Sequence, residues 1–218
     1  MQKKTNKQEI FGICVDSTEL VEVLKAINSK KSLFLVSINP EYIVAAQQDK
    51  EFRDILNSAD LRIPDGFGLR FMIPDLPIIP GRKLVETLAT AKYKIFYLGG
   101  KNDESQKMAQ KYGGAWDVGY PSTNDQMIIN KINKYKPDIL LVAYKYPMGE
   151  KWLYANRQKL NARVVMAVGG SFRYLTGMDR LPPEIVEKMG LEWLWRLILQ
   201  PWRIKRQMKI MQFMWMVV

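Results

Sequence analysis

The sequence predicts a doubly wound α/β fold, in which a parallel sheet lies between layers of helices and a helical segment follows at the C-terminal end. Short apolar runs of strand length alternate along the chain with stretches of helical periodicity. Glycines or an Asn-Pro pair follow most of these runs, where strands would end. The 218 residues are 47% hydrophobic and 25% charged, a composition that fits one sizeable globular core.

The expected elements follow one another in strand–helix alternation. Strands are expected over residues 32–38, 60–64, 92–100, 137–144 and 162–170. Helices are expected over residues 40–59, 103–113 and about 124–136. Asn39 and Pro40 suit a helix start, because asparagine caps the first turn and proline fits its first position.

From Pro182 onward the helical pattern is continuous apart from breaks at Gly190 and Pro201. We therefore expect an α/β domain over residues 1–181 and a helical appendage over residues 182–218.

Charge and composition narrow the classes of function. The formal net charge of +11 favours an anionic partner, such as nucleic acid, acidic lipid or a phosphorylated substrate. The chain has no histidine and one cysteine, Cys14, which excludes Ser-His-Asp catalysis, histidine-ligated zinc and a thiolate metal site. Proton transfer would fall to Asp, Glu, Lys or Tyr. The polar first residues and the lack of a long apolar run predict a cytosolic protein without secretory signal or spanning helix.

Ligands of open parallel sheets bind at the carboxyl ends of the strands. In this chain those ends carry Ser37, Asn39, Asp65, Gly66, Gly99, Gly100, Tyr146, Pro147, Gly169 and Gly170. Glycine there lets backbone amides approach a phosphate or a sugar, or simply makes a tight turn, and the two readings are evenly balanced for the Gly-Gly pairs. No GxGxxG follows the first strand, which disfavours an ordinary dinucleotide oxidoreductase.

Asp65 is the candidate catalytic carboxylate. It stands at the exit of the second expected strand, and Gly66 and Gly68 keep bulky side chains away from it. A carboxylate there can accept a proton from an attacking hydroxyl or hold a sugar hydroxyl. The alternative is a helix N-cap, in which its oxygens satisfy the first amides of a short helix.

The last segment combines basic and apolar side chains. A helix over residues 202–218 would place an apolar ridge within an arc of about 80°. This apolar ridge consists of Ile204, Met208, Met211, Trp215 and Val218. Residues 201–218 carry four basic side chains and no acidic one, and the chain is almost wholly apolar beyond Lys209. Such a segment favours insertion into the interface of an anionic bilayer without spanning it.

The alternative for this segment is a helix docked on the domain or buried in an oligomer. Docking through the apolar ridge leaves Phe213, Met216 and Val217, on the other sides of the helix, unexplained. The oligomeric state itself stays open.

Residues 169–207, which include "GGSFRYLTG" and "GLEWLWRLILQPWRIKRQ", resemble the WecG/TagA/CpsF glycosyltransferases. The motif positions that match are Gly169, Phe172, Gly177, Arg180, Pro182, Gly190, Leu191, Glu192, Trp193, Arg196, Leu197, Pro201, Arg203 and Arg206. Residues 37–69 are similar to the first block of that family, with Asn39 and the Asp65-Gly66-x-Gly68 loop in register. The resemblance covers nearly the whole chain.

The resemblance implies a Rossmann-like domain with a C-terminal appendage that meets the membrane. It implies an inverting, metal-independent transfer from a UDP-sugar, commonly UDP-N-acetylmannosamine or its uronic acid, to a polyprenyl-diphosphate-linked sugar. This reaction builds bacterial surface polysaccharide or teichoic acid linkage units. It also implies a peripheral enzyme at the inner face of the cell membrane, with no cofactor.

The resemblance assigns roles to particular residues. Asp65 matches the general base, and Ser37 and Asn39 would line the donor sugar pocket. Arg196, Arg203 and Arg206 match appendage arginines that meet a diphosphate, a task for which the guanidinium fork is suited. The expected substrate-binding set also includes Gly66, Gly99, Gly100, Glu150, Gly169 and Gly170.

The chain departs from the family pattern at a few positions. Gly149 replaces a glutamine before Glu150, Ile78 replaces an arginine, and Lys83 stands in place of an acidic residue. Arg82 or Lys83 is the candidate replacement for the lost cation. These changes put the identity of the donor sugar in question more than the reaction class.

Two rival functions remain at this stage. The net charge of +11 also suits a nucleic-acid-binding protein, but the densest basic cluster is mixed with Met and Trp and no nucleic-acid motif is present, so no nucleic acid is expected as partner. The changes at Gly149 and Ile78 leave room for a family relative that has lost catalysis and serves as an assembly partner.

Overall fold

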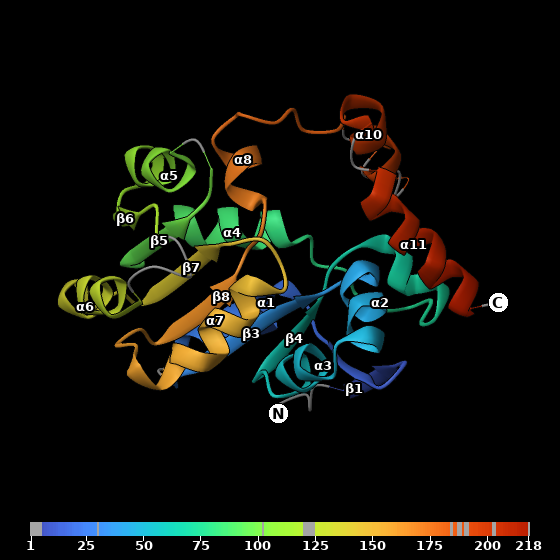
Figure 1. The fold of residues 1–218 in the computed structure, drawn as a ribbon, viewed down its shortest axis with the longest axis horizontal. Helices are drawn as coiled ribbons and strands as arrows, with labels where there is room; N and C mark the ends of the chain where they lie inside the picture. Colours follow the sequence, from blue (N-terminus) through green and yellow to red (C-terminus); the bar gives the residue numbers. More distant parts are fainter. Residues whose placement is uncertain are drawn as a thin grey trace.

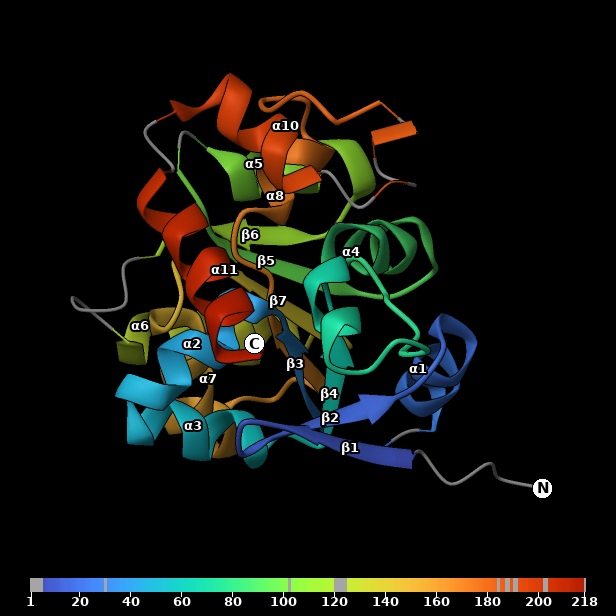
Figure 2. The same cartoon turned by 90° about the vertical axis from the view of Figure 1, so that its right-hand side faces the viewer.

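The computed structural model describes residues 6–29, 31–101, 103–119, 125–183, 185–186, 189, 192–201 and 204–217. Within these ranges a six-stranded parallel sheet is covered by helices on both faces (Figure 1). A two-stranded antiparallel ribbon lies beside the sheet, near the N-terminus (Figure 2). The predicted α/β class with a parallel sheet is confirmed.

The sheet has the strand order β4-β3-β8-β7-β5-β6, and every neighbouring pair is parallel. Its strands are β3 (Leu33–Ile38), β4 (Leu61–Pro64), β5 (Ile95–Gly99), β6 (Ala115–Asp117), β7 (Ile139–Ala143) and β8 (Val164–Ala167). Each of the five expected strands is present, with individual ends trimmed by up to three residues. The short β6 was not predicted, because its three residues are only half-buried and show no apolar run.

Most of the helices connect the strands and cover the sheet, and α10 and α11 follow the last strand. They are α1 (Leu20–Asn28), α2 (Pro40–Gln48), α3 (Lys50–Asn57), α4 (Gly81–Thr90), α5 (Glu104–Tyr112), α6 (Asp125–Tyr135), α7 (Met148–Asn156), α8 (Ser171–Leu175), α10 (Glu192–Leu199) and α11 (Ile204–Val217). Short 3-10 turns are η1 (Phe67–Phe71) and η2 (Arg157–Lys159). The single helix expected over residues 40–59 is divided at Asp49, whose side chain accepts a hydrogen bond from the Phe52 amide and so caps α3.

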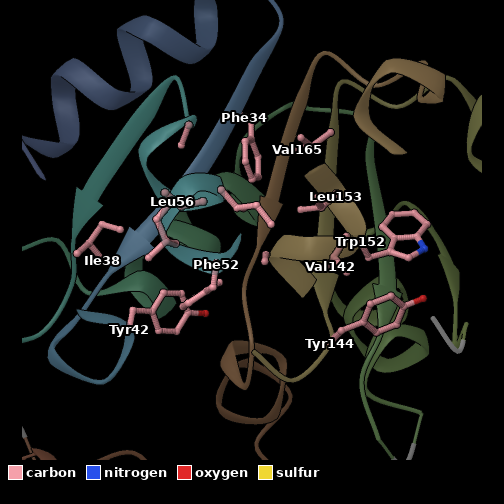
Figure 3. Close-up of a cluster of buried hydrophobic side chains, with 14 of the residues drawn as sticks. Phe34, Ile38, Tyr42, Phe52, Leu56, Val142, Tyr144, Trp152, Leu153 and Val165 are labelled. Atoms are coloured by element: carbon pink, nitrogen blue, oxygen red, sulfur yellow. The ribbon is translucent and has the colours of Figure 1, made fainter. Parts of the chain in front are cut away.

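The strands are apolar on both sides because each face of the sheet has its own core. Phe34, Val142 and Val165 contribute to one core, under α2, α3, α6 and α7 (Figure 3). Their strand neighbours Leu35 and Leu141 point to the other core, under α1, α4, α5 and α8. This alternation explains why the strands were visible in the sequence as continuous apolar runs rather than as period-two patterns.

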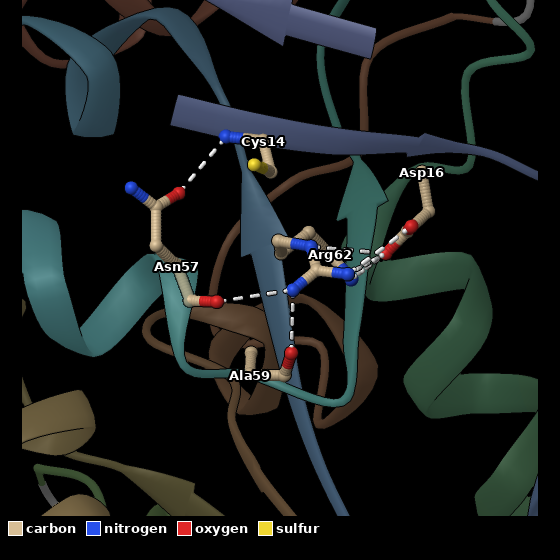
Figure 4. Close-up of polar contacts among 5 residues, drawn as sticks. All are labelled: Cys14, Asp16, Asn57, Ala59 and Arg62. Carbon is tan, nitrogen blue, oxygen red and sulfur yellow. Dashed lines mark hydrogen bonds and ion pairs between the residues drawn. The ribbon is translucent and has the colours of Figure 1, made fainter. Parts of the chain in front are cut away.

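The ribbon of β1 (Asn6–Ile10) and β2 (Ile13–Ser17) is fixed to β4 by a buried ion pair (Figure 4). The Arg62 guanidinium lies 2.9 Å from Asp16 Oδ2, and both side chains are at most 5% exposed. Arg62 also donates to the carbonyl oxygens of Asn57 and Ala59. Removing either partner of such a pair typically costs about 3–5 kcal/mol, since the other charge stays buried.

Helix α11 packs against α2 and beside η1 (Figure 2). Phe213 is fully buried, and its ring meets that of Phe11 edge to face at 6.2 Å. Met214, Met216 and Val217 are partly buried and pack against the same core. The docking alternative therefore holds for one face of α11, through residues other than those of the apolar ridge.

The apolar ridge itself faces outward. Ile204, Met208, Met211 and Trp215 are 49%, 59%, 63% and 86% exposed. Val218, its last predicted member, lies outside the described residues. In the described part of the chain, no helix has both the length and the apolarity to cross a bilayer.

Candidate active site

Asp65 lies directly after β4, at the carboxyl edge of the sheet. Its backbone amide donates to the Ile38 carbonyl at 2.7 Å, which continues the β3–β4 pairing by one residue. The next turn, η1, has Gly66 rather than Asp65 at its N-cap position. The alternative in which the Asp65 oxygens accept the first amides of this turn stays open beside the catalytic one.

The Asp65 loop is packed closely onto the start of α2. Gly66 has φ +97°, a conformation that favours glycine. A Cβ atom at Gly68 would lie 2.8 Å from Pro40 Cγ, so only glycine permits this approach. Asn39 caps α2 as predicted, because its Oδ1 accepts a hydrogen bond of 2.9 Å from the Tyr42 amide. These contacts hold the ends of β3 and β4 together.

Asp65 and Ser37 converge over Gly81, the first residue of α4. A Cβ atom at Gly81 would lie 2.9 Å from Asp65 Oδ2 and 3.4 Å from Ser37 Oγ. The Ser37 hydroxyl is buried and has no hydrogen-bond partner among the described residues. Buried hydroxyl groups are normally satisfied, so one left open beside a carboxylate points to a polar group of a ligand.

Gly81 was not among the expected site residues. The sequence does contain a signal for it, since Pro80-Gly81 comes just before a helical pattern and glycine is an unusual choice for a first helical position. Gly81 is the first residue of α4, so the Asp65 carboxylate lies beside the N-terminal end of that helix, where the helix dipole contributes positive potential.

Glu150 lies inside the domain rather than at the surface of the sheet edge. It is 2% exposed, and the Tyr42 hydroxyl donates to its Oε1 at 2.5 Å. Its Oε2 has no partner among the described residues. Burial raises the pKa of Glu150, and the hydrogen bond from Tyr42 opposes that rise only in part. The predicted role of Glu150 in substrate binding stays a prediction.

A series of hydrogen bonds joins α11 to α2, near Tyr42. Lys209 Nζ donates to the Tyr146 hydroxyl at 3.0 Å, and this hydroxyl donates to Glu41 Oε1 at 3.1 Å. The Tyr146 ring also lies 5.1 Å from the Tyr42 ring, between α2 and α11. These hydrogen bonds were not predictable from the sequence, because the residues are far apart in it and each is an ordinary surface residue type.

The two Gly-Gly strand ends differ in what surrounds them. A Cβ atom at Gly99 would lie 2.7 Å from the Tyr144 ring, and one at Gly100 would lie 2.7 Å from Glu104 Cβ. At Gly169 and Gly170, by contrast, no described atom beyond the glycine and its two chain neighbours lies within 4 Å of that position. Internal packing thus explains the first pair, whereas the second pair leaves open space beside its backbone.

An ion-pair network ties the two strand ends together. Arg173 in α8 contacts Asp179 at 2.8 Å and Glu104, at the start of α5, at 3.3 Å. Glu104 is 3% exposed, and burial raises its pKa while Arg173 acts in the opposite direction. The network fixes the turn that contains Gly170 against the turn that contains Gly100.

The side chains of the three appendage arginines lie outside the described part of the structure. Arg203 lies outside the described residues, as do the side chains of Arg196 in α10 and Arg206 in α11. Their predicted contact with a diphosphate stays a prediction. In the described ranges, no three acidic, cysteine or histidine side chains are grouped as metal ligands would be.

The structure shows what surrounds the positions at which this chain departs from the family pattern. A Cβ atom at Gly149 would lie 3.1 Å from Ala167 Cβ and 3.4 Å from the Tyr144 carbonyl oxygen, so a glutamine would require local movement. Ile78 packs partly buried against the core. Arg82 is half-buried in the first turn of α4, directly after Gly81, whereas Lys83 is exposed. Arg82 is therefore the better placed of the two candidate replacement cations.

Comparison with known proteins agrees with this geometry. Residues 8–218 match the glycosyl transferase WecG/TagA/CpsF family. Proteins named N-acetylglucosaminyldiphosphoundecaprenol N-acetyl-beta-D-mannosaminyltransferase from Staphylococcus aureus strains MRSA252 and NCTC 8325 are 27% and 28% identical to the chain. Each alignment covers 99% of this chain and 94% of the relative. With the family match over nearly its whole length, this chain belongs to the WecG/TagA/CpsF family of glycosyl transferases.

Proposed function

We propose that this enzyme transfers N-acetylmannosamine, or a related hexose such as its uronic acid, from a UDP-sugar to a polyprenyl-diphosphate-linked N-acetylglucosamine. The relatives carry this acceptor and this transferred sugar in their names. The observation that carries the proposal is the convergence of the Asp65 carboxylate and the unpartnered Ser37 hydroxyl over Gly81. The product would enter cell-surface polysaccharide or teichoic acid synthesis.

Asp65 acts as the general base in the proposed reaction. Its carboxylate accepts the proton of an acceptor hydroxyl, whose oxygen attacks the anomeric carbon of the donor. The bond from that carbon to the diphosphate oxygen breaks on the opposite side, so the configuration inverts and UDP leaves with the electron pair. Ser37 and Asn39 hold the donor sugar near this carbon.

The charge that develops on the departing diphosphate has to be stabilised. The open backbone at Gly169 and Gly170 can bring amide groups close to phosphate oxygens. Arg82 and the appendage residues Arg196, Arg203 and Arg206 supply positive charge for the donor or acceptor diphosphate. In this arrangement the protein itself provides the electrostatic stabilisation, and the reaction proceeds without a metal ion.

The apolar ridge of α11 brings the enzyme to its lipid-linked acceptor. Its exposed Met and Trp side chains suit the interface of a bilayer, and the four basic residues of the segment contribute on the order of 1 kcal/mol each at an anionic surface. The appendage over residues 182–218 is thus proposed as the contact with the inner face of the cell membrane, while residues 1–181 carry the catalytic domain.

The decisive experiment measures transfer by an Asp65→Asn variant. With a panel of UDP-sugars and polyprenyl-diphosphate-linked N-acetylglucosamine, the wild-type enzyme should release UDP and form product. Asp65→Asn should lower kcat by about 10²–10⁴, whereas the control Asp75→Asn, at an exposed aspartate outside the convergence point, should not. A folded Asp65→Asn enzyme with full turnover would remove Asp65 from the base role.

A further inference from the structure

We propose that the outer surface of η1, formed by Phe67, Arg70, Phe71 and Met72, binds the lipid end of the acceptor, with the isoprenoid chain on the aromatic rings and the diphosphate near Arg70. This inference rests on the proposed function and assigns the part of the site that recognises the lipid. We call these four residues the η1 surface.

The η1 surface is apolar and exposed for a structural reason. Leu69 is fully buried and anchors the turn, while Phe67, Phe71 and Met72 are 43%, 57% and 36% exposed. Two phenylalanines and a methionine in one short turn form an exposed apolar area of the kind that marks a binding surface. Leu69 supplies the buried side chain of this turn, and among the described residues the Phe71 ring takes no part in either core cluster.

The η1 surface lies near the Asp65 carboxylate because the two are joined by a short stretch of backbone. Phe67 follows Asp65 by two residues, so their Cα atoms lie no more than about 7 Å apart. The contacts of Gly66 and Gly68 with Pro40 hold this connection in place. A lipid-linked sugar whose hydroxyl reaches Asp65 has to lead its diphosphate and its chain away from the same spot.

The charge of Arg70 complements such a ligand. Its guanidinium lies 5.2 Å from the centre of the Phe67 ring, and its Nε donates to the Leu76 carbonyl at 3.0 Å. These two contacts hold a partly exposed positive charge against an aromatic ring. A molecule that carries a diphosphate joined to a long apolar chain matches both features, whereas a neutral lipid matches only one.

The η1 surface continues toward the membrane-facing appendage. Helix α11, which carries the apolar ridge, lies beside η1 in both overall views (Figures 1 and 2). A chain that leaves η1 along α11 would pass directly to the bilayer in which the apolar ridge is placed. We therefore assign the bilayer contact to the apolar ridge and the acceptor lipid to the η1 surface.

Phe71→Ser tests this division, because serine removes the ring and leaves the backbone of the turn unchanged. With an acceptor of undecaprenyl length in detergent micelles, KM should rise about tenfold to a hundredfold, the loss expected from one buried phenylalanine. The KM for an acceptor with a short alkyl chain, the kcat with both acceptors and flotation with anionic vesicles should be unchanged. An equal loss with both acceptors, or no loss with either, would overturn the proposal.

Matched variants separate the lipid surface from the bilayer contact. Trp215→Ser on the apolar ridge should reduce vesicle flotation without the chain-length effect, and Met127→Ser, 66% exposed on α6, should change neither property. If Phe71→Ser instead loses flotation in proportion to its activity on vesicles, η1 is a bilayer contact and the proposal fails.

Direct binding keeps the test independent of turnover. Calorimetry with polyprenyl diphosphate in micelles should show weaker binding by Phe71→Ser and by Arg70→Gln. With the uncharged polyprenol, only Phe71→Ser should differ from wild type. If the wild-type enzyme binds polyprenyl diphosphate in this way but transfers no sugar, the proposed function fails while the inference about η1 stands. Equal binding by wild type and both variants would refute it.

Discussion

Asp65 directly follows β4, whereas Glu150 lies in the first turn of α7, and the surroundings of the two carboxyl groups are opposite. Asp65 is half-buried and converges with the Ser37 hydroxyl over a glycine. Glu150 is 2% exposed and is held by Tyr42 in the core under α2 and α7. A general base has to be in reach of its substrate, so these surroundings favour Asp65 over Glu150 for the proposed role. A carboxylate near the carboxyl edge of a sheet is therefore judged by its environment as well as by its position.

The largest difference is expected in turnover. Asp65→Asn should lose about 10²–10⁴ in kcat, because proton acceptance in the transition state is lost. Glu150→Gln should lose no more than about tenfold, because the amide oxygen can still accept the Tyr42 hydrogen bond at an interior position. Steady-state kinetics of both variants, with melting temperatures as the control for folding, measure the contrast. Equal losses of kcat in the two variants would show that the two carboxyl groups do not differ in their role.

Gly81→Ala should damage the Asp65 side of the comparison alone. The new methyl group would stand 2.9 Å from Asp65 Oδ2, closer than real contacts allow, so the carboxylate has to move. A displacement of this kind is expected to cost about tenfold or more in kcat. The melting temperature should not fall by a corresponding amount, since alanine is a better helix former than glycine. Full turnover by a folded Gly81→Ala enzyme would contradict the placement of Asp65 over this glycine.

Tyr42→Phe should destabilise the protein through its effect on Glu150. It removes the hydroxyl that donates to Oε1 and leaves a buried carboxyl group without that partner. The free energy of unfolding should fall by about 1–3 kcal/mol. Urea unfolding of the variant measures this loss, and Tyr154→Phe, at an exposed tyrosine of α7, is the control. An unchanged stability would show that the hydrogen bond contributes nothing to the fold.

The smallest effect is a pH dependence of stability. Because burial raises the pKa of Glu150, the folded state holds this proton more tightly than the unfolded state. The stabilising contribution is complete below the ordinary glutamate pKa of about 4.3 and is lost as the pH rises toward the higher value of the folded state. Glu150→Gln should remove this part of the decline. Unfolding curves of wild type and variant from pH 4 to pH 8 should therefore differ in slope, and parallel curves would contradict the assignment.

Features that depend on local pattern were predictable from the sequence. The five strands are apolar runs bounded by turn residues, and the place of Asp65 directly after a strand is indicated by the glycines that follow it. Features that depend on distant contacts were not predictable. Phe213 docks α11 because Phe11, near the other end of the chain, meets its ring. The packing of Gly99 against Tyr144 and the clearance beside Asp65 at Gly81 likewise arise only after the strands have been assembled.

The burial of Phe213 has a practical consequence for separating anchorage from folding. A chain cut before α11 would uncover Phe11 and the outer side of α2, and would also lose the Lys209 bond to Tyr146. Such a fragment would expose a new apolar surface that favours aggregation. Its inactivity could then result from aggregation as readily as from loss of membrane contact. Single replacements on the outward side of α11 keep Phe213 buried and therefore test loss of membrane contact alone.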